Sequence, residues 1–535
     1  MYWNVESSIR NPNQAWNLPR NGIHKTKVLI KTTKITVKYA YMPVRRPFRT
    51  ILPIVSKNRG LILLFLAVSF IRLYRLSDFA MFLSDQGRDA IIVKRIVTGE
   101  HFPAIGAPTS IGQVYLGPFY YYFIAPFLWL FSFDPAGLAF AVAFYSILGL
   151  IVSYLLIKKI LGRSVGAFFL IFAGFSFVMV DTSRFSWNPN LLPTFSFLTL
   201  LLYYFMLKEK KYVYSILFGS FFAFCLQLHY LSSLLVLPFF LYLVLGSRLH
   251  KEFLPTLKRL AVACFAFLFW NIPLLIFDLR HGFLNSKNFY KLFTERAMVE
   301  SGSLFSRLAQ TSNYFFSPLI TTHLPNPIVL LLILLILFVS IVTFIRQKRD
   351  SFLFLNLLNI SSYLLFFSLL NSPKYTHYFG PIFFSMFFLI ASLSVYGWKR
   401  SPYGKILVCI VLILYLYTNG RQYYFLFGKS YGQILHAKTV AEFLAPKIGN
   451  RPFNIATWPV EFAEDHYLYF LELKGHVPVS REKIEISDQM FVLCSQKPCR
   501  VIQSPSWNIS MFGKAKIATI WDVENITIYK LAHDK

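Results

Sequence analysis

Long apolar runs, separated by short polar linkers, recur along residues 60–418. A helix needs roughly 17–25 largely apolar residues to cross a bilayer. Runs near that length lie at 60–76, 136–157, 164–180, 191–207, 213–228, 230–246, 260–277, 327–345, 351–370, 379–397 and 404–418. The first run contains Arg72 and Arg75, which we expect near its outer end. The pattern predicts a mainly α-helical, polytopic membrane protein with about 11 transmembrane helices.

Lysine and arginine gather in alternate linkers. The basic linkers "IKKILGR", "KEKK", "SRLHKEFLPTLKR", "RQKR" and "WKRSPYGK" alternate with "DTSRFSWNPN", a join at His229, "DLRHGFLNSKN" and "NSPKYTHY". Because cytoplasmic linkers are enriched in Lys and Arg, the first set is expected inside and the second outside. This predicts a multi-pass protein of the plasma (inner) membrane with a cytoplasmic N terminus and an extracytoplasmic C terminus. The same bias accounts for the net charge of +30, because Lys and Arg are kept on the cytoplasmic side. We therefore expect membrane lipid, and no nucleic acid, as a partner.

One further apolar run, "YLGPFYYYFIAPFLWLFSF" at 115–133, conflicts with this alternation. Counting it as a span would place every later basic linker outside. Its Gly-Pro start and tyrosine cluster suit the membrane interface, where amphipathic aromatic rings are favoured. We therefore expect a juxtamembrane or re-entrant helix inside a first outer loop at 77–135.

Two non-membrane segments flank the predicted transmembrane module, which spans 59–418. Residues 1–58 are rich in Lys and Arg and contain one acidic residue, so we expect a disordered cytoplasmic tail near anionic lipid. Translation from Met42 is an alternative start. Residues 419–535 contain strand-like segments at 453–458, 489–495, 500–503 and 526–531 and helix-like segments at 433–446 and 463–473. They predict a small extracytoplasmic α/β domain.

Five cysteines in 535 residues do not form a disulfide scaffold. Cys494 and Cys499 lie together in the C-terminal domain, where an oxidising compartment would permit a local disulfide. Placement on adjacent strands would instead keep the two side chains apart.

The stretch "FLSDQGRDAIIVKR", 82–95, carries an acidic cluster just after the first apolar run. Asp85, Arg88 and Asp89 have the spacing i, i+3 and i+4, which places them on one face of a helix beginning near residue 85. An apolar stripe that includes Val93 continues along the helix and suits a helix lying on the outer leaflet. Asp85 is either an N-cap with Arg88 as its local partner or a catalytic carboxylate, and the two roles are compatible.

This acidic motif, followed by juxtamembrane helices, resembles the GT-C glycosyltransferases. The resemblance is to the branch of protein O-mannosyltransferases and lipid A aminoarabinose transferases, and it covers roughly 60–400. "GPFYYYFIAPFLWLF" looks like the proline-started juxtamembrane helix of that branch, "DTSRFSWNPNLLP" like its second outer loop, and "PKYTHYFGP" like its late Lys/Arg-Tyr segment. The chain departs from the family in carrying Asp-Gln rather than Asp-Glu at 85–86. It also has Asn188 where some relatives have a second aspartate.

The resemblance implies transfer of a sugar from a polyprenyl-phosphate carrier to an acceptor on the outer face. Such transfer needs a carboxylate to remove the acceptor proton and cations near the leaving phosphate. We assign Asp85 as the base, with Asp89 orienting Arg88 or contacting an acceptor or metal. The remaining candidates fall in the outer loops: Arg88, Arg184, Arg280 and Lys374 for the donor phosphate, and Asn188, His229, His281, Tyr375 and His377 for substrate.

Several alternatives stay open for these residues. Each cation either binds phosphate or snorkels to the interface and pairs locally. The histidines are either substrate ligands or satisfied polar residues at helix ends. No cofactor is indicated firmly, and a divalent cation is left open, with its ligands unknown. The sugar is also undetermined, and the acceptor is a lipid, a glycan or a protein.

Two other classes compete with a glycosyltransferase. An outer-face glycan polymerase or ligase would have large arginine-rich outer loops rather than an acidic first loop. A lipid or solute transporter would typically carry carboxylates within its spans and broken helices near the midplane. The predicted spans of this chain are nearly free of Asp and Glu, which favours the glycosyltransferase.

Overall fold

The computed structural model describes residues 48–109, 114–245, 253–294, 303–346, 351–370, 374–459, 463–481 and 483–534. Residues Asn58–Lys535 form one compact unit. Most of the predicted tail, including Met42, lies outside the described residues. The first helix, α1 (Phe48–Leu73), begins within the part predicted to be disordered, so that boundary was wrong.

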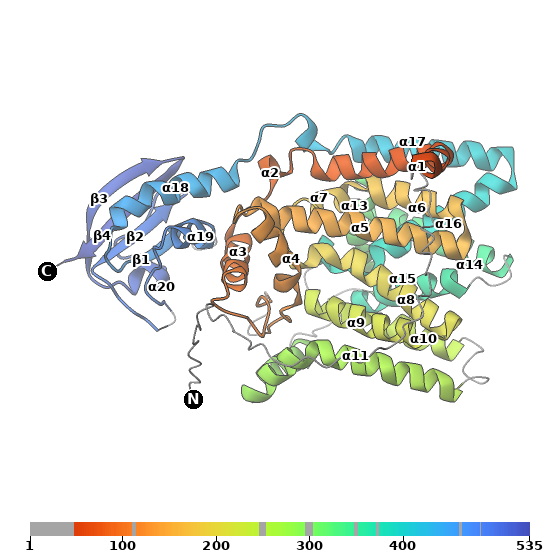
Figure 1. Ribbon diagram of the computed structural model, residues 1–535, viewed down its shortest axis with the longest axis horizontal. Helices are drawn as coiled ribbons and strands as arrows, with labels where there is room; N and C mark the ends of the chain where they lie inside the picture. The colour runs from red at the N-terminus through yellow and green to blue at the C-terminus, as the bar shows by residue number, and fades with distance from the viewer. Residues whose placement is uncertain are drawn as a thin grey trace, which may run out of the picture. The chain divides into compact units, whose positions relative to one another are not determined.

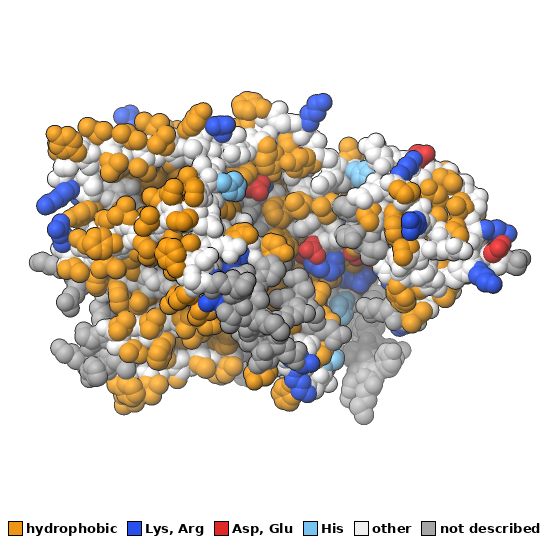
Figure 2. All heavy atoms as spheres, turned by 180° about the vertical axis from the view of Figure 1, so that it is seen from behind, with side chains coloured by type: hydrophobic (Ala, Val, Ile, Leu, Met, Phe, Trp, Pro, Cys, Tyr) orange, Lys and Arg blue, Asp and Glu red, His pale blue; other side chains and the backbone are white. Residues whose placement is uncertain are grey.

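Each apolar run predicted to span the membrane falls on helix in the described chain. These helices are α1, α5 (Ala136–Leu161), α6 (Arg163–Phe175) with α7 (Phe177–Thr182), α8 (Leu192–Glu209), α9 (Tyr212–Leu228), α10 (Val236–Leu245), α11 (Phe253–Arg280), α14 (Asn326–Arg346), α15 (Ser351–Leu369), α16 (Gly380–Arg400) and α17 (Pro402–Gly420). In the described residues, 7 helical segments are long and apolar enough to cross a membrane, and the segments at α6, α9 and α10 are shorter apolar helices. The mainly α-helical membrane fold is confirmed. The helices of this bundle run side by side in Figure 1, and apolar side chains cover much of the face in Figure 2.

The helices of the first outer loop are short. They are α2 (Leu76–Phe79), α3 (Ser84–Val97) and α4 (Phe119–Leu130). With 12 residues, α4 is about 18 Å long, well below the roughly 30 Å of a bilayer core. This length agrees with the predicted juxtamembrane helix. The later segment 281–326 carries two more helices, α12 (Leu284–Thr294) and α13 (Leu304–Ile320).

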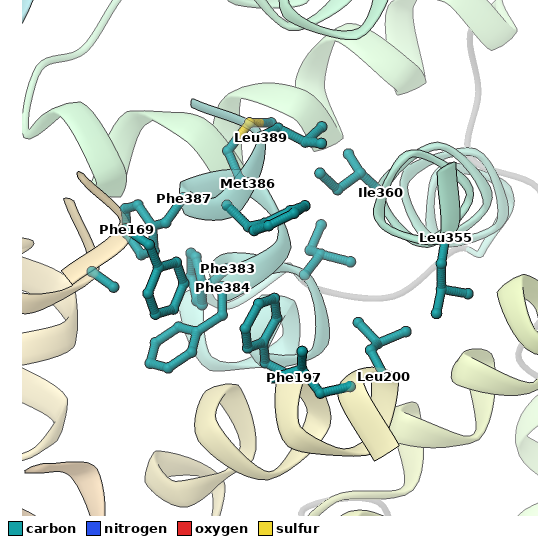
Figure 3. Close-up of a cluster of buried hydrophobic side chains, with 14 of the residues drawn as sticks. Phe169, Phe197, Leu200, Leu355, Ile360, Phe383, Phe384, Met386, Phe387 and Leu389 are labelled. Carbon is teal, nitrogen blue, oxygen red and sulfur yellow. The ribbon is translucent and has the colours of Figure 1, made fainter. Parts of the chain in front are cut away.

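The interior of the bundle is packed with aromatic rings. Phe169 of α6 stacks on Phe197 of α8 with ring centroids 5.1 Å apart, and Phe384 of α16 lies edge-on to both rings. Figure 3 shows these rings together with Leu355 and Ile360 of α15. The membrane window of α8 is buried entirely by protein, so α8 is the central helix of the bundle. Ring pairs of this geometry add to the stabilisation from area burial alone.

The basic linkers collect at one end of the bundle. Lys159, at the end of α5, pairs with Glu209, at the end of α8, at 3.1 Å. Near the same end, Arg346 of α14 donates to the Tyr396 hydroxyl of α16. The helices of the first outer loop and the sheet domain lie at the opposite end (Figure 1). The described parts of these basic linkers therefore lie together at one end of the bundle.

The C-terminal domain is a mixed sheet with helices. It contains α18 (Gln433–Ile448), β1 (Asn454–Trp458), α19 (Asp465–Leu473), β2 (Gln489–Cys494), α20 (Trp507–Ser510), β3 (Ala515–Val523) and β4 (Ile526–His533). The strand order is β1-β2-β4-β3, in which only β1 and β2 are parallel. Ala456 is in register with Val492, and Val492 with Tyr529. Three predicted strands and both predicted helices are present. The strand predicted at 500–503 is absent, and β3 was missed.

The two cysteines of this domain, Cys494 and Cys499, form a disulfide. The bond closes a short loop at the end of β2. Of the two alternatives from the sequence, the structure therefore has the local disulfide and not two separated cysteines.

The C-terminal domain packs on α3. The Arg95 guanidinium donates to the Glu472 carboxylate at 2.7 Å, which joins α3 to α19. The Tyr469 hydroxyl of α19 donates to the Phe133 carbonyl at 2.6 Å. The apolar stripe of α3, with Val93 fully buried, belongs to a core shared with α4 and α19. The expectation that this stripe lies on the membrane surface was therefore wrong.

Candidate functional site

The acidic cluster lies in the first two turns of α3. The helix begins at Ser84, and Leu83 is its N-cap, so Asp85 is not the N-cap. The cap is instead made by Gln86, whose Oε1 accepts from the Leu83 backbone N–H at 3.1 Å. The Asp-Gln departure from the family motif has a structural role, since Gln86 also donates through Nε2 to the Ser186 carbonyl at 3.1 Å, which a glutamate carboxylate could not do.

Arg88 holds both carboxylates of the cluster. Its Nη1 donates to Asp85 Oδ1 at 2.9 Å, and its Nη2 donates to Asp89 Oδ1 at 2.8 Å. The Asp85 side chain is 48% exposed, whereas that of Asp89 is 1% exposed. Asp85 is therefore the carboxylate that a ligand can reach, and Asp89 is a buried partner of Arg88.

Burial changes the chemistry of Asp89. Loss of solvent raises the pKa of Asp89, and the charge of Arg88 opposes that rise. Asp89 Oδ2 and the Tyr121 hydroxyl are both buried, and the interaction of this hydroxyl with the carboxylate also lowers the pKa of Asp89. An ion pair of this kind is costly to break, because the surviving charge is left in a poorly solvated place.

A third carboxylate, Asp465, comes from the C-terminal domain and was missed in the sequence. It is the first residue of α19, whose start packs against Gly87 of α3. Burial, followed by the charge of Glu464, raises the pKa of Asp465 to about 6, while the nearby charge of Arg88 lowers it. Nothing in the local sequence connects residue 465 with residue 88, which lie far apart in the chain and meet only in the folded protein.

Several predicted substrate residues meet in a second cluster at the same end of the bundle. The ring of His377 lies 4.6 Å from Trp187, 5.8 Å from His229 and 5.8 Å from Tyr375. Asn188 Nδ2 donates to the carbonyl of Leu228, directly before His229, at 2.7 Å. The predicted second outer loop, the α9–α10 join and the late Lys-Tyr segment therefore converge.

The short loop after α7 connects the two clusters. Ser186 accepts from Gln86 Nε2 through its carbonyl at 3.1 Å, and its hydroxyl hydrogen-bonds Tyr120 of α4 at 2.7 Å. The next residue, Trp187, contacts His377 of the second cluster. One loop thus fixes the acidic helix against the histidine cluster.

Arg184 lies in that loop but faces the bundle. Its Nη1 donates to the carbonyls of Ile71 and Arg72 at 3.1 and 3.0 Å, and its Nη2 to that of Tyr74 at 2.9 Å. Its guanidinium carbon lies 3.8 Å from the ring centroid of Phe425, and the residue is buried. Arg184 therefore caps the end of α1, where helix carbonyls lack partners within the helix, and is not placed to bind phosphate.

The other predicted cations have different settings. Lys374 is buried, with its Nζ 3.4 Å from the Leu370 carbonyl and close to the ring of Phe367. Arg280 is exposed at the end of α11. The next residue, His281, is also exposed and stacks on Phe277 of α11. Arg280 is the more accessible of the two cations, and Lys374 belongs to the segment that carries His377.

A metal site is not evident among these side chains. Within the described ranges, no group of three or more His, Cys, Asp or Glu side chains is placed to hold a metal ion. The carboxylates of Asp85 and Asp89 are both directed to Arg88.

Comparison with known proteins gives a family match over part of the chain and a similar fold. Residues 116–272, from α4 into α11, match the family model described as dolichyl-phosphate-mannose-protein mannosyltransferase. The fold is similar to crystal structures of ArnT from Cupriavidus metallidurans. The form bound to undecaprenyl phosphate has a TM-score of 0.58 at 14% identity, covering 88% of this chain and 98% of that chain. The apo form has a TM-score of 0.56 at 14% identity, covering 89% and 98%.

A weaker likeness, with a TM-score of 0.48 at 12% identity, is to the oligosaccharyltransferase AglB from Archaeoglobus fulgidus, covering 78% of this chain and 64% of that chain. No curated protein matches this chain in sequence. The comparisons therefore show a family match across residues 116–272 and a fold shared with ArnT along most of the chain.

Proposed function

We propose that this chain moves a sugar from a polyprenyl-phosphate-linked donor to an acceptor at the end of the bundle that carries α3. Two comparisons support a lipid-phosphate donor. The matching family model is described by its dolichyl-phosphate-mannose donor, and one ArnT structure is described as bound to undecaprenyl phosphate. The observation that carries the proposal is the reachable Asp85 carboxylate, held by Arg88 next to the loop that leads to the histidine cluster.

Asp85 acts as the base in this proposal. The acceptor oxygen attacks the anomeric carbon of the donor while the bond between that carbon and the phosphate oxygen breaks. The phosphate leaves with the electron pair, and Asp85 takes the acceptor proton. Asp89 has a positioning role, since it fixes the guanidinium that in turn fixes Asp85.

Cations must offset the charge that develops on the leaving phosphate. Among the predicted cations we assign this role to Arg280 and Lys374, because the donors of Arg184 are already used by helix carbonyls. Arg88 contributes through Asp85 and Asp89 rather than as a free phosphate ligand.

The reaction takes place on the outer face in this proposal. The basic linkers lie at the end of the bundle opposite α3, and cytoplasmic linkers are enriched in Lys and Arg. The protein is then a multi-pass protein of the plasma (inner) membrane, with the C-terminal domain outside.

Asp85→Asn tests the base. Membranes containing the variant are incubated with radiolabelled polyprenyl-phosphate sugars, and transfer of label is measured at matched protein levels. Positioned base catalysis contributes about 10²–10⁴-fold to the rate, so we expect the variant to transfer sugar at least about 100-fold more slowly than wild type. The matched control is Asp78→Asn in α2, whose carboxylate also pairs with an arginine three residues away and is 50% exposed. Transfer by Asp85→Asn at the control's rate would exclude Asp85 as the base.

A further inference from the structure

A cavity of about 240 Å³ lies between the segment that leads into α3 and the C-terminal domain. Phe82 and Leu83 form its wall on the side of α3, and residues of α18, α19, β1, β2 and β4 form the rest. Drug-sized ligands occupy pockets of roughly 300–1,000 Å³, so this cavity suits a smaller group, such as a single ring. Leu83 is the N-cap of α3, two residues before Asp85, so the cavity adjoins the start of the helix that carries the proposed base.

The lining combines aromatic rings with neutral polar groups. Phe82 and Tyr467 supply rings, and Gln433, Thr457, His436 and His466 supply hydrogen-bonding groups. The described residues that line the cavity include no Lys, Arg, Asp or Glu. Burial lowers the pKa of His466 to about 4, which keeps its ring neutral near pH 7. A phosphate or carboxylate would find no opposite charge in this lining, whereas a neutral ring with several hydroxyls would find both stacking surfaces and partners.

His466 gives an independent indication of a ligand. The residue is 5% exposed, its ring interacts with the Ala463 backbone, and its Nδ1 makes no hydrogen bond of standard geometry in the described part of the chain. Buried polar atoms are nearly always paired, since an unpaired one costs about 1–3 kcal/mol. Its neighbour in the lining, His436, is already satisfied through the Tyr467 hydroxyl at 3.2 Å. A ligand hydroxyl in the cavity would supply the missing partner of His466.

The cavity opens where the disulfide loop follows β2. Ser495 and Gln496 line this side, and both are exposed. They lie inside the loop closed by Cys494 and Cys499. The disulfide thus holds the rim of the cavity in a defined shape, at a position reachable from solvent.

We infer that this cavity binds one neutral sugar ring of the acceptor. The inference rests on the proposed function, since it supplies the acceptor class that the proposed function leaves open. The donor is less suited to the cavity because its phosphate needs cations, and Arg280 and Lys374 are not part of the lining. The acceptor is therefore a glycan or glycoconjugate whose terminal ring sits in the cavity, with a hydroxyl directed toward Asp85.

Binding of neutral sugars to the full-length protein tests the cavity without any transfer reaction. The protein in nanodiscs is mixed with glucose, galactose, mannose or arabinose at millimolar concentrations, and saturation-transfer NMR reports binding. We expect at least one of the four to bind saturably and glucose 1-phosphate to bind no better than its parent sugar. Absence of saturable binding by all four to the wild-type protein would overturn the inference.

A pair of serine variants locates that binding. Ser495→Trp places an indole at the exposed rim, and Ser510→Trp makes the same change at an exposed position in α20 outside the lining. We expect Ser495→Trp to weaken sugar binding at least tenfold and Ser510→Trp to leave it unchanged. Equal binding by the two variants would place the sugar elsewhere and reject the cavity.

A readout of transfer separates this inference from the proposed function. With a transferable acceptor, Ser495→Trp should raise the KM for acceptor while leaving the KM for the polyprenyl-phosphate donor unchanged. A raised donor KM alone would assign the ring to the donor and reject the inference. Transfer that is intact in Ser495→Trp would leave the proposed function standing and reject only the cavity. If the protein binds neutral sugars but transfers no sugar from a polyprenyl-phosphate donor, the cavity would stand as a sugar site and the proposed function would be rejected.

Discussion

Gly87 of α3 lies directly against the backbone of His466 in α19. A Cβ added at residue 87 would come within 2.2 Å of the His466 nitrogen and 2.5 Å of the Asp465 carbonyl carbon. No side chain can move aside to relieve such a contact, because the obstructing atoms belong to the backbone. The absence of a side chain at this one position is therefore what lets the C-terminal domain reach the acidic cluster.

Gly87→Ala should separate the C-terminal domain from α3. Overpacking typically costs about 1–3 kcal/mol, so we expect faster proteolysis between α17 and α18 together with reduced sugar transfer. The control is Gly60→Ala in α1, where a Cβ meets nothing within 4 Å. The same digestion pattern for Gly87→Ala and Gly60→Ala would contradict the importance of this contact.

The Arg88–Asp89 pair should behave as a buried ion pair. Arg88→Gln leaves the Asp89 carboxylate unpaired, and such a loss costs about 3–5 kcal/mol, which thermal unfolding in detergent would detect. The double variant Arg88→Gln with Asp89→Asn should recover part of that loss, since no charge is stranded. Lys516→Gln removes an exposed pair to Asp534 and should cost less than about 1 kcal/mol. Equal losses for Arg88→Gln and Lys516→Gln would argue against burial as the cause.

Arg184 and Arg280 should differ in what their loss affects. Arg184→Gln removes the donors that cap the end of α1, so the protein should unfold at a lower temperature. Arg280 is exposed, and Arg280→Gln should leave the unfolding temperature unchanged while raising the KM for donor and lowering kcat. A donor effect confined to Arg184→Gln would reverse these assignments.

Titration of Asp465 should make the stability of the protein depend on pH. Its folded pKa, about 6, lies above the usual aspartate value, so between about pH 4 and pH 6 the folded state holds a proton that the unfolded state has lost. This group therefore makes the protein less stable as pH rises through that window, with no further change above it. Asp465→Asn should raise the unfolding temperature relative to wild type more at pH 7.5 than at pH 4.5.

The control for this pH effect is Glu442→Gln. The Glu442 carboxylate is 48% exposed and forms a long ion pair with Lys474. The difference between this variant and wild type should be small at both pH values. A stabilisation by Asp465→Asn of the same size at pH 4.5 and pH 7.5 would exclude titration of Asp465 as the source.

Thiol counting checks the disulfide. Alkylation of denatured, unreduced protein should modify Cys225, Cys264 and Cys409 and leave Cys494 and Cys499 unmodified. Mass spectrometry would then show three alkyl groups, and five after reduction. Five groups before reduction would contradict the pairing.

The membrane fold was predictable because its signals are local. The length of an apolar run and the basic residues beside it are both features of one short segment, and the helices of the structure lie on these segments. Strand β3 was missed because its residues from Lys516 to Ile520 are exposed and show no alternation of apolar and polar positions. The segment 500–503 was mistaken for a strand because Val501 and Ile502 are β-branched, but it follows the disulfide loop and only Val501 is buried.

The site was predictable only in part, and for a related reason. Asn188, His229 and His377 lie close together, as expected for linkers predicted at the same end of the bundle, and their role in substrate binding stays a prediction. Arg184 was predicted as a phosphate ligand because the sequence around it does not reveal that its guanidinium donates to carbonyls at the end of α1. Asp465 was missed because its proximity to Arg88 depends on how a separate domain docks.

Arg72 and Arg184 also bear on how the chain is made. Arg72 Nη1 donates to the carbonyl of Gly174 at the end of α6, at 2.8 Å, while Arg184 donates to the carbonyl of Arg72 at the end of α1. The two residues are 112 positions apart, so the ribosome completes α1 well before the residue that caps it emerges. The carbonyls at the end of α1 therefore gain their side-chain partner only after the third apolar segment has been synthesised, so the last turn of the first helix is completed by a residue made much later.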